Sequence, residues 1–211
     1  MTFEQMYNLS NSILDKSGSP YFNEVEFDSF CNIAYNDWIE QEHSVFEQTG
    51  EHSVKLQKLL VAYTKVGTEI SLSTDITNFR YLYRINGVFT SICNEISKIE
   101  TRNIRKAQLD DIDVMNQDPF NKPIAREPLY IYNAGQKISV YPTADKINIT
   151  YLREPQKIDS ENNPSVVFEL PDYLAEEIVE MCVKKLNVNT ENYSQAQALN
   201  QEIAQRNGIL E

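Results

Sequence analysis

The stretch that decides the fold runs from Leu129 to Leu152 and reads LYIYNAGQKISVYPTADKINITYL. It contains three short runs rich in β-branched and aromatic residues, separated by two groups of turn residues. Within residues 147–151 apolar side chains alternate with polar ones, which places the apolar set on one face of a strand. We therefore predict a three-stranded antiparallel meander with one buried face.

The sequence before the meander predicts helices first and short strands after them. Apolar residues at helical spacing indicate helices over residues 3–16, 25–48 and 53–64. After them we expect strands over 70–72 and 79–85, a two-residue hairpin turn at Asn86-Gly87, a return strand over 88–93 and a short helix over 105–116. A Pro-rich extended loop, residues 119–128, then leads into the meander.

The sequence after the meander is helical again. Helices are predicted over residues 173–187 and 190–207, and Gly208 is placed to end the second. This last helix is mostly polar, with a narrow apolar edge, so it needs a partner to pack against. The order of elements predicts the α+β class: a helical bundle of amino- and carboxy-terminal helices with a small antiparallel sheet inserted between them.

Length and charge narrow the possible functions. A chain of 211 residues is long enough for one domain with its own core. We expect a single domain over 1–211, with amino-terminal helices in 1–66, a β-rich part in 69–155 and carboxy-terminal helices in 166–211. The net charge of −12 works against binding phosphate backbones or anionic lipid. A local basic patch at Arg102, Arg105 and Lys106 is still an alternative, since these residues lie close together in the sequence.

The spacing of the cysteines and the length of the apolar runs indicate the cellular compartment in which the protein is made. Cys31, Cys93 and Cys182 are odd in number and widely spaced, so we expect buried thiols in a reducing environment rather than disulfides or zinc. The amino terminus lacks the features of a signal peptide, and no apolar run is long enough to span a bilayer. We expect a protein made in a cytoplasm, with no membrane partner.

Motifs for catalysis are lacking in the sequence. It contains no nucleophile elbow, phosphate-binding glycine loop or zinc-protease motif. The two histidines, His43 and His52, are expected at the surface. We predict that the protein is not an enzyme and has no catalytic residue, cofactor or metal.

Several segments together resemble one protein family in their order and spacing. Seven stretches carry the resemblance: Phe3–Leu9, Glu26–Trp38, Asp118–Pro123, Glu127–Tyr130, Ile138–Pro142, Tyr151–Pro155 and Phe168–Ile178. In this order they resemble the head-to-tail connector proteins of tailed bacteriophages, in particular the ring or adaptor proteins of crAss-like phages. These are similar in turn to the tail-tube and tail-accessory adaptors of short-tailed phages.

The resemblance implies a structural role in a virion. About twelve copies would form a ring between the portal and the tail, closed by head-to-tail contacts. The partners would be other copies of the chain, the portal protein and further tail or ring proteins. DNA would pass through the ring without specific binding, which the acidic charge suits. The location would be the portal–tail junction of the virion.

The resemblance also directs attention to candidate assembly residues. We expect the Pro-rich loop, or the turn at 133–135, to face a ring neighbour, and the last helix to pack on the portal or a neighbouring subunit. The candidate interface residues are Pro119, Phe120, Asn121, Pro123, Tyr193, Leu199 and Ile203.

Two alternatives from other classes remain. One is a small carbohydrate- or protein-binding module without catalysis, using the aromatic residues Tyr130, Tyr132 and Tyr141. The other is a hydrolase with a metal held by Asp110, Asp111 and Asp113. These carboxylates also suit the first turns of a short helix, where the helix dipole favours negative charge.

Overall fold

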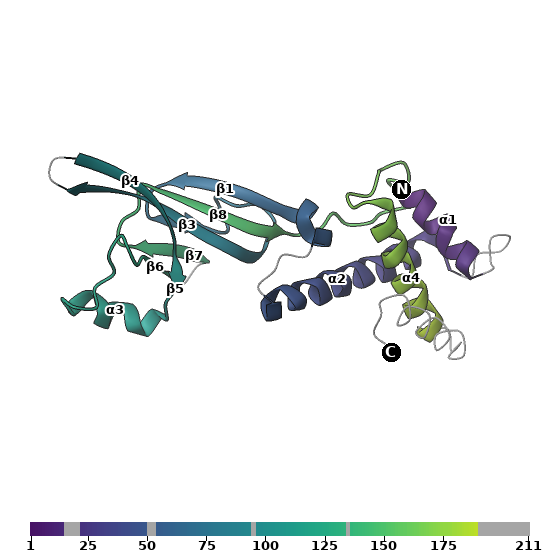
Figure 1. Cartoon of the computed structure of the whole chain (residues 1–211). Helices are drawn as coiled ribbons and strands as arrows, with labels where there is room; N and C mark the ends of the chain where they lie inside the picture. The colour runs from purple at the N-terminus through teal and green to yellow at the C-terminus, as the bar shows by residue number, and fades with distance from the viewer. Residues whose placement is uncertain (15–21, 50–53, 94–95, 134–135, 190–211) are drawn as a thin grey trace. The chain divides into compact units, whose positions relative to one another are not determined.

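The computed structural model describes residues 1–14, 22–49, 54–93, 96–133 and 136–189. They form a mixed α+β chain, which confirms the predicted class (Figure 1). Contacts within the chain divide it into two compact units, Met1–Lys58 with Pro155–Glu211, and Leu59–Glu154. The first is referred to below as the helical unit and the second as the sheet unit.

The helical unit is built on α2 (Glu24–Thr49) and α4 (Asp172–Asn189), which pack against each other. The predicted apolar stripe of α2 is confirmed, since Phe27, Cys31 and Trp38 are at most 1% exposed. α4 contributes Leu174 and Ile178, both fully buried. These positions recur at helical spacing, so each helix presents one continuous apolar face to the other.

α1 (Phe3–Ile13) completes this unit by packing against α4. Thr2 and Gln5 form a capping box, in which each side chain accepts a hydrogen bond from the other residue's backbone N–H. Thr2 also forms a β-bridge with Val167, and Phe3 lies against the ring of Phe168. The start of α1 is thereby fixed to the segment before α4.

The thiols of the helical unit are buried, as the sequence predicts. Cys31 and Cys182 are free and fully buried. Burial and the neighbouring Cys182 thiol hold the pKa of Cys31 well above its usual value. Uncharged, inaccessible thiols of this kind act as small apolar side chains.

The predicted α-helix over 53–64 is wrong, and the span 1–66, predicted to hold the amino-terminal helices, ends in a strand. The structure has a 3₁₀ helix, η1 (Val54–Leu59), followed directly by strand β1 (Leu60–Val66). β1 pairs antiparallel with the last strand, with Val61 opposite Tyr151 and Tyr63 opposite Ile149. Its β-branched and aromatic residues suit a strand once a partner is present, and that partner is distant in sequence.

The sheet unit contains two four-stranded sheets. One has the order β1-β8-β3-β4 and the other the order β2-β7-β6-β5. Every pair is antiparallel except β5 with β6, which is parallel. The strands not yet given are β2 (Glu69–Ser71), β3 (Phe79–Cys93), β4 (Ile96–Asn103), β5 (Arg105–Lys106), β6 (Leu129–Asn133), β7 (Lys137–Tyr141) and β8 (Lys146–Arg153).

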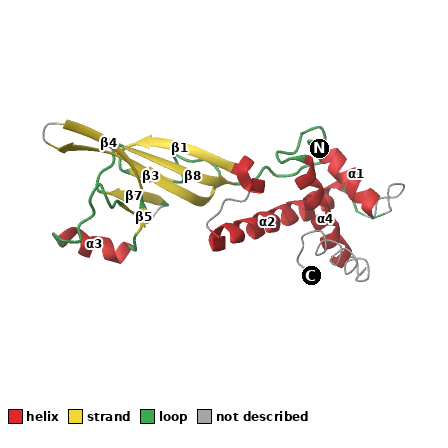
Figure 2. Ribbon diagram, viewed as in Figure 1, coloured by secondary structure: helices red, strands yellow, loops and turns green. Residues whose placement is uncertain are grey.

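The sheets enclose an apolar core. Ile70, Ile138 and Val140 from one sheet join Ile147 and Ile149 from the other in a single buried cluster. Figure 2 shows the resulting layers of the sheet unit, with the β1-β8-β3-β4 sheet, then the β2-β7-β6-β5 sheet, then α3 (Leu109–Gln117). α3 contacts β6 and buries Ile112.

The hairpin predicted at Asn86-Gly87 is wrong. β3 runs through both residues for 15 residues, and the return strand is β4, not residues 88–93. Gly87 is needed for packing, because a Cβ there would lie 2.5 Å from Cε2 of Phe89. The Phe89 ring therefore occupies the space that a side chain at 87 would fill.

The meander is right in its strands and wrong in their pairing. β6 and β7 pair with each other, but β8 lies between β1 and β3 in the other sheet. The alternation of residues 147–151 is confirmed, since Ile147, Ile149 and Tyr151 are at most 5% exposed. Alternation states which face of a strand is buried but not which strand lies beside it.

The helices do not simply flank the strands, as the predicted arrangement has it. α3 begins at Leu109, inside the β-rich part, and the first two residues of the predicted helix, Arg105 and Lys106, form β5. The predicted helix 190–207, with its candidate residues Tyr193, Leu199 and Ile203, lies outside the described residues. Within the described segments, no helix combines the length and apolar character needed to cross a membrane.

Candidate interaction surfaces

The candidate assembly residues of the Pro-rich loop differ in their exposure to solvent. Pro119, Phe120 and Asn121 are exposed, and Phe120 is 96% exposed. Pro123 is buried within its own subunit. The surface available to a partner is therefore the first part of this loop, with Phe120 as its largest apolar side chain.

Phe120 is held in place by the end of α3. The Phe120 N–H donates to Oδ1 of Asp118 at 2.9 Å, and the Asn121 side-chain amide donates to Oδ2 of the same carboxylate. These bonds hold the pKa of Asp118 below its usual value. The loop closes further on through a bridge between Ile124 and Glu127. These contacts fix the backbone on both sides of Phe120, which reduces the backbone entropy that this loop would lose on binding a partner.

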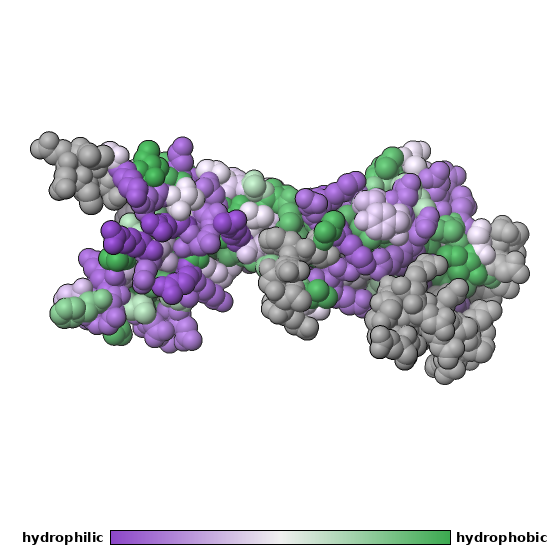
Figure 3. Space-filling view, viewed as in Figure 1, coloured by the Kyte–Doolittle hydropathy of each residue, from purple (hydrophilic) through white to green (hydrophobic). Residues whose placement is uncertain are grey.

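Further apolar side chains are exposed beside Phe120 in sequence. Leu109 is 53% exposed, Val114 is 69% exposed and Ile124 is 53% exposed. Figure 3 shows hydrophobic side chains at α3 and the following loop, next to strongly hydrophilic ones. We call residues 109–124 the α3 surface. Clustered exposed apolar residues of this kind mark protein-binding surfaces more often than isolated ones do.

The acidic residues Asp110, Asp111 and Asp113 lie on the exposed sides of α3. Across the described parts of the chain, no group of three or more His, Cys, Asp or Glu side chains is arranged to hold a metal ion. These aspartates therefore give the α3 surface its negative charge.

Tyr130 and Tyr132 lie together on β6. Their rings meet edge to face with centroids 5.8 Å apart, and Nζ of Lys106 lies 5.3 Å from the centre of the Tyr132 ring. Burial, with a smaller contribution from Tyr130, raises the pKa of Tyr132 to about 12. Burial also raises the pKa of Tyr130. Because Lys106 and Tyr130 contact Tyr132, part of its ring surface is already covered.

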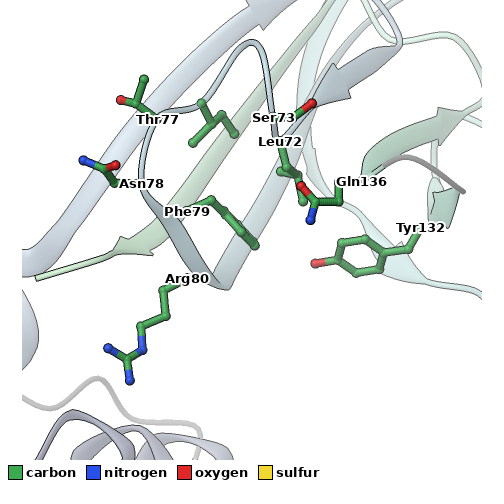
Figure 4. A pocket seen from close by; sticks show the side chains of 9 residues that line it. Leu72, Ser73, Thr77, Asn78, Phe79, Arg80, Tyr132 and Gln136 are labelled. Atoms are coloured by element: carbon green, nitrogen blue, oxygen red, sulfur yellow. The ribbon is translucent and has the colours of Figure 1, made fainter. Parts of the chain in front are cut away.

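Tyr132 borders two shallow hollows of the sheet unit. One, of about 730 Å³, is lined by residues of the 72–80 segment with Tyr132 and Gln136. In Figure 4 the phenol of Tyr132 points toward Phe79, with the Gln136 amide nearby and Arg80 directed away. The other, of about 600 Å³, lies between Tyr132 and residues 106–110. Tyr141, the third tyrosine of the predicted aromatic site, does not line either hollow.

The local basic patch left open by the sequence is not assembled. Arg102 pairs with Glu100 at 2.5 Å, Arg105 pairs with Glu127 at 3.4 Å, and Lys106 lies over Tyr132. Their charges are therefore engaged in three separate places rather than facing one phosphate backbone.

The prediction of surface histidines is wrong for His43, which is 7% exposed and packs beside Phe46. His43 lies on the interior side of α2 rather than at its exposed end. His52 lies outside the described residues.

Sequence reasoning did not anticipate one surface, the outer face of the β1-β8-β3-β4 sheet. On this face lie the residues that alternate with the buried ones: Ala62, Thr64, Val66, Arg84, Asn86, Val88, Thr90, Ile99, Thr101, Asn103, Lys146, Asn148 and Thr150. Each is exposed or partly exposed. The polar positions of the alternating runs carried this signal, but only the pairing of the strands assembles them on one face.

Comparison of the chain with protein-family models gives no match, and comparison with curated proteins gives none either.

Proposed function

We propose that this protein is a structural component of a tailed-phage virion that forms an oligomeric ring between portal and tail. The ring would extend the DNA channel and would carry no catalytic activity. The observation that carries the proposal is the fixed display of Phe120, 96% exposed, beside exposed apolar residues of α3. A protein that functions as a lone monomer gains nothing from such a surface, whereas a ring subunit needs one for its neighbour.

Two further features support this proposal. The motif order over most of the chain resembles phage connector proteins. The net charge of −12 suits a channel wall that DNA passes without binding.

The proposal is tested by measuring particle mass by light scattering, on the purified protein alone and with the portal protein of the same phage. Electron microscopy of any large species then shows whether it is a ring. A closed ring, alone or on the portal, is the expected result. A protein that stays monomeric and does not bind the portal would overturn the proposal.

A point variant tests whether the exposed ring of Phe120 is needed for ring formation. Phe120→Ser removes the exposed ring, and because the residue is almost wholly exposed it should leave stability within about 0.5 kcal/mol. Ring formation should weaken. The matched control is Val54→Ser, since Val54 is also strongly exposed, at 79%, but lies outside the α3 surface.

A second candidate is the small carbohydrate- or protein-binding module. The hollow of about 730 Å³ favours it, because Tyr132 and Phe79 supply aromatic surface and Gln136 supplies an amide. Glycan-array binding by the monomer, lost in Tyr132→Ala, would support this function. If the array shows no glycan binding and the protein forms rings, the result supports the structural role and contradicts the binding module.

A further inference from the structure

The outer face of the β1-β8-β3-β4 sheet is unlike the rest of this acidic chain. None of its thirteen positions given above is Asp or Glu, and two of them, Arg84 and Lys146, are basic. The charged side chains at these thirteen positions are therefore all basic, in a chain of net charge −12.

Among the described residues, no carboxylate pairs with Arg84 or Lys146 of this face. Arg84 donates to the side-chain oxygens of Asn86, at 3.2 Å, and Asn103, at 3.0 Å, and both acceptors are neutral amides. Lys146 is exposed at the start of β8. Beside them Val66 is 73% exposed and Ile99 is 70% exposed, so the face offers apolar contact as well as charge.

The α3 surface has the complementary character. Residues 109–124 contain four acidic residues, Asp110, Asp111, Asp113 and Asp118, against one basic residue, Lys122. The hydrogen bonds from Phe120 and Asn121 lower the pKa of Asp118, which favours its charged form. Val114 and Phe120 supply the exposed apolar groups.

These two surfaces lie on different layers of one unit. The outer face belongs to the β1-β8-β3-β4 sheet, and α3 contacts β6 of the other sheet, with the apolar core between the sheets (Figure 2). The α3 surface of a subunit therefore cannot contact the outer sheet face of the same subunit. Copies that join such unlike surfaces make head-to-tail contacts, which generate a ring when the rotation closes.

We propose that the α3 surface of one copy docks on the outer face of the β1-β8-β3-β4 sheet of the next copy. The partner is a second copy of this chain, and the inference rests on the proposed ring-forming function. The aspartates of α3 lie against Arg84 and Lys146, and Val114 and Phe120 lie against the apolar positions of the sheet. Complementary charge sets the orientation of the contact, and the aromatic ring supplies buried area.

Two variants block one surface each. Asp110→Lys with Asp111→Lys and Asp113→Lys reverses the charge of the α3 surface. Arg84→Glu with Lys146→Glu reverses the charge of the sheet face. Each variant alone should weaken self-association at least about tenfold, because like charges then face each other. A mixture of the two should regain assembly with the variants alternating, since the intact surfaces attract each other and the two reversed surfaces are again opposite in charge.

Matched controls carry the same change in charge at exposed positions elsewhere. They are Glu4→Lys with Glu161→Lys and Glu176→Lys for the first variant, and Lys58→Glu with Lys157→Glu for the second. Circular dichroism checks that every variant is folded. Val114→Ser with Phe120→Ser tests the same contact without any change in charge.

Sedimentation velocity is measured for each protein and for the mixture, alone and with the portal protein. Loss of assembly by each variant alone, its recovery in the mixture, and controls that assemble like the original chain are the expected results. If the original chain forms rings and both blocked variants still form them, the docking inference is wrong and the proposed function stands. If the original chain forms no assembly alone or with the portal, the proposed function fails and the inference fails with it.

Discussion

Asn32 and Ile158 are joined by two hydrogen bonds, although 126 residues separate them. The Ile158 N–H donates to Oδ1 of Asn32 at 2.9 Å, and Nδ2 of Asn32 donates to the Ile158 carbonyl at 2.9 Å. The amide of Asn32 thus satisfies both backbone groups of a residue that belongs to neither helix nor strand. Such pairing allows an irregular segment to be buried.

The same face of α2 repeats this arrangement on either side of Asn32. The buried Asp28 accepts from the Ser160 N–H at 2.8 Å and from its hydroxyl at 2.7 Å. Tyr35 donates to Glu169 at 2.8 Å, and Glu169 also accepts from the Gln156 N–H. Asp28, Asn32 and Tyr35 share one side of the helix, so together they fix the segment between β8 and α4.

Asn32→Ala should lower the free energy of unfolding of the helical unit by about 2–4 kcal/mol, because it leaves the buried Ile158 N–H and carbonyl without partners. Denaturant unfolding followed by the fluorescence of Trp38, the single tryptophan, measures this. Asn8→Ala is the control, since Asn8 is exposed on α1. Equal stability of the two variants would show that the Asn32 bonds do not stabilise the unit.

Gly87→Ala should destabilise the sheet unit by about 1–3 kcal/mol through overpacking. The added Cβ would lie 2.5 Å and 2.6 Å from two atoms of the Phe89 ring and 3.1 Å from Cδ1 of Ile104. Thermal unfolding by circular dichroism measures the loss. Combining the change with Phe89→Leu should cost less than the sum of the single changes, since the smaller side chain removes the clash. Additive costs would contradict this packing argument.

Glu100 should titrate with a pKa of about 2 rather than the usual 4.5, because Lys98 and Arg102 donate to its carboxylate. The folded-state pKa is lowered, so any stabilisation from these bonds is present above the unfolded pKa and lost as pH falls toward 2. Carbon-detected NMR titration of the carboxylate measures the midpoint. Lys98→Met and Arg102→Leu should each move the midpoint upward, and an unchanged midpoint would contradict the assignment.

Tyr132 should ionise with a pKa of about 12, against an ordinary 10.0. Its folded-state pKa is raised, so its contribution to stability is complete below pH 10 and is lost as pH rises toward 12. Absorbance of the phenolate measures the titration, with Tyr132→Phe identifying the transition. Tyr130→Phe should lower the pKa of Tyr132 slightly, since burial is the larger cause and Tyr130 the smaller. A transition near 10 would show that Tyr132 is solvated.

Much of the fold was predictable where the pattern is local. The buried stripe of α2 follows from helical spacing, and the strands β6, β7 and β8 follow from alternation between turn residues. The exposed part of the Pro-rich loop was likewise predictable as a surface feature. The burial of Pro123 was not, because it depends on how the loop returns to the sheet.

The errors all lie where a distant segment changes the local outcome. Residues 60–64 have helical spacing, but β8 is beside them and they form a strand. Asn86-Gly87 has the composition of a hairpin turn, but β4 and β8 pair with both residues and β3 continues through them. These partner strands are not visible to a pattern confined to a short stretch of chain.

By itself the sequence determined the α+β class, the apolar face of each long element, the acidic charge and the buried state of Cys31 and Cys182. These follow from residue type and spacing, which act over a few neighbouring residues. Only the tertiary structure decided the division of the strands between two sheets and the acid-free face that this pairing assembles. Register brings residues far apart in sequence to one surface, so such a face exists only after long-range pairing is complete.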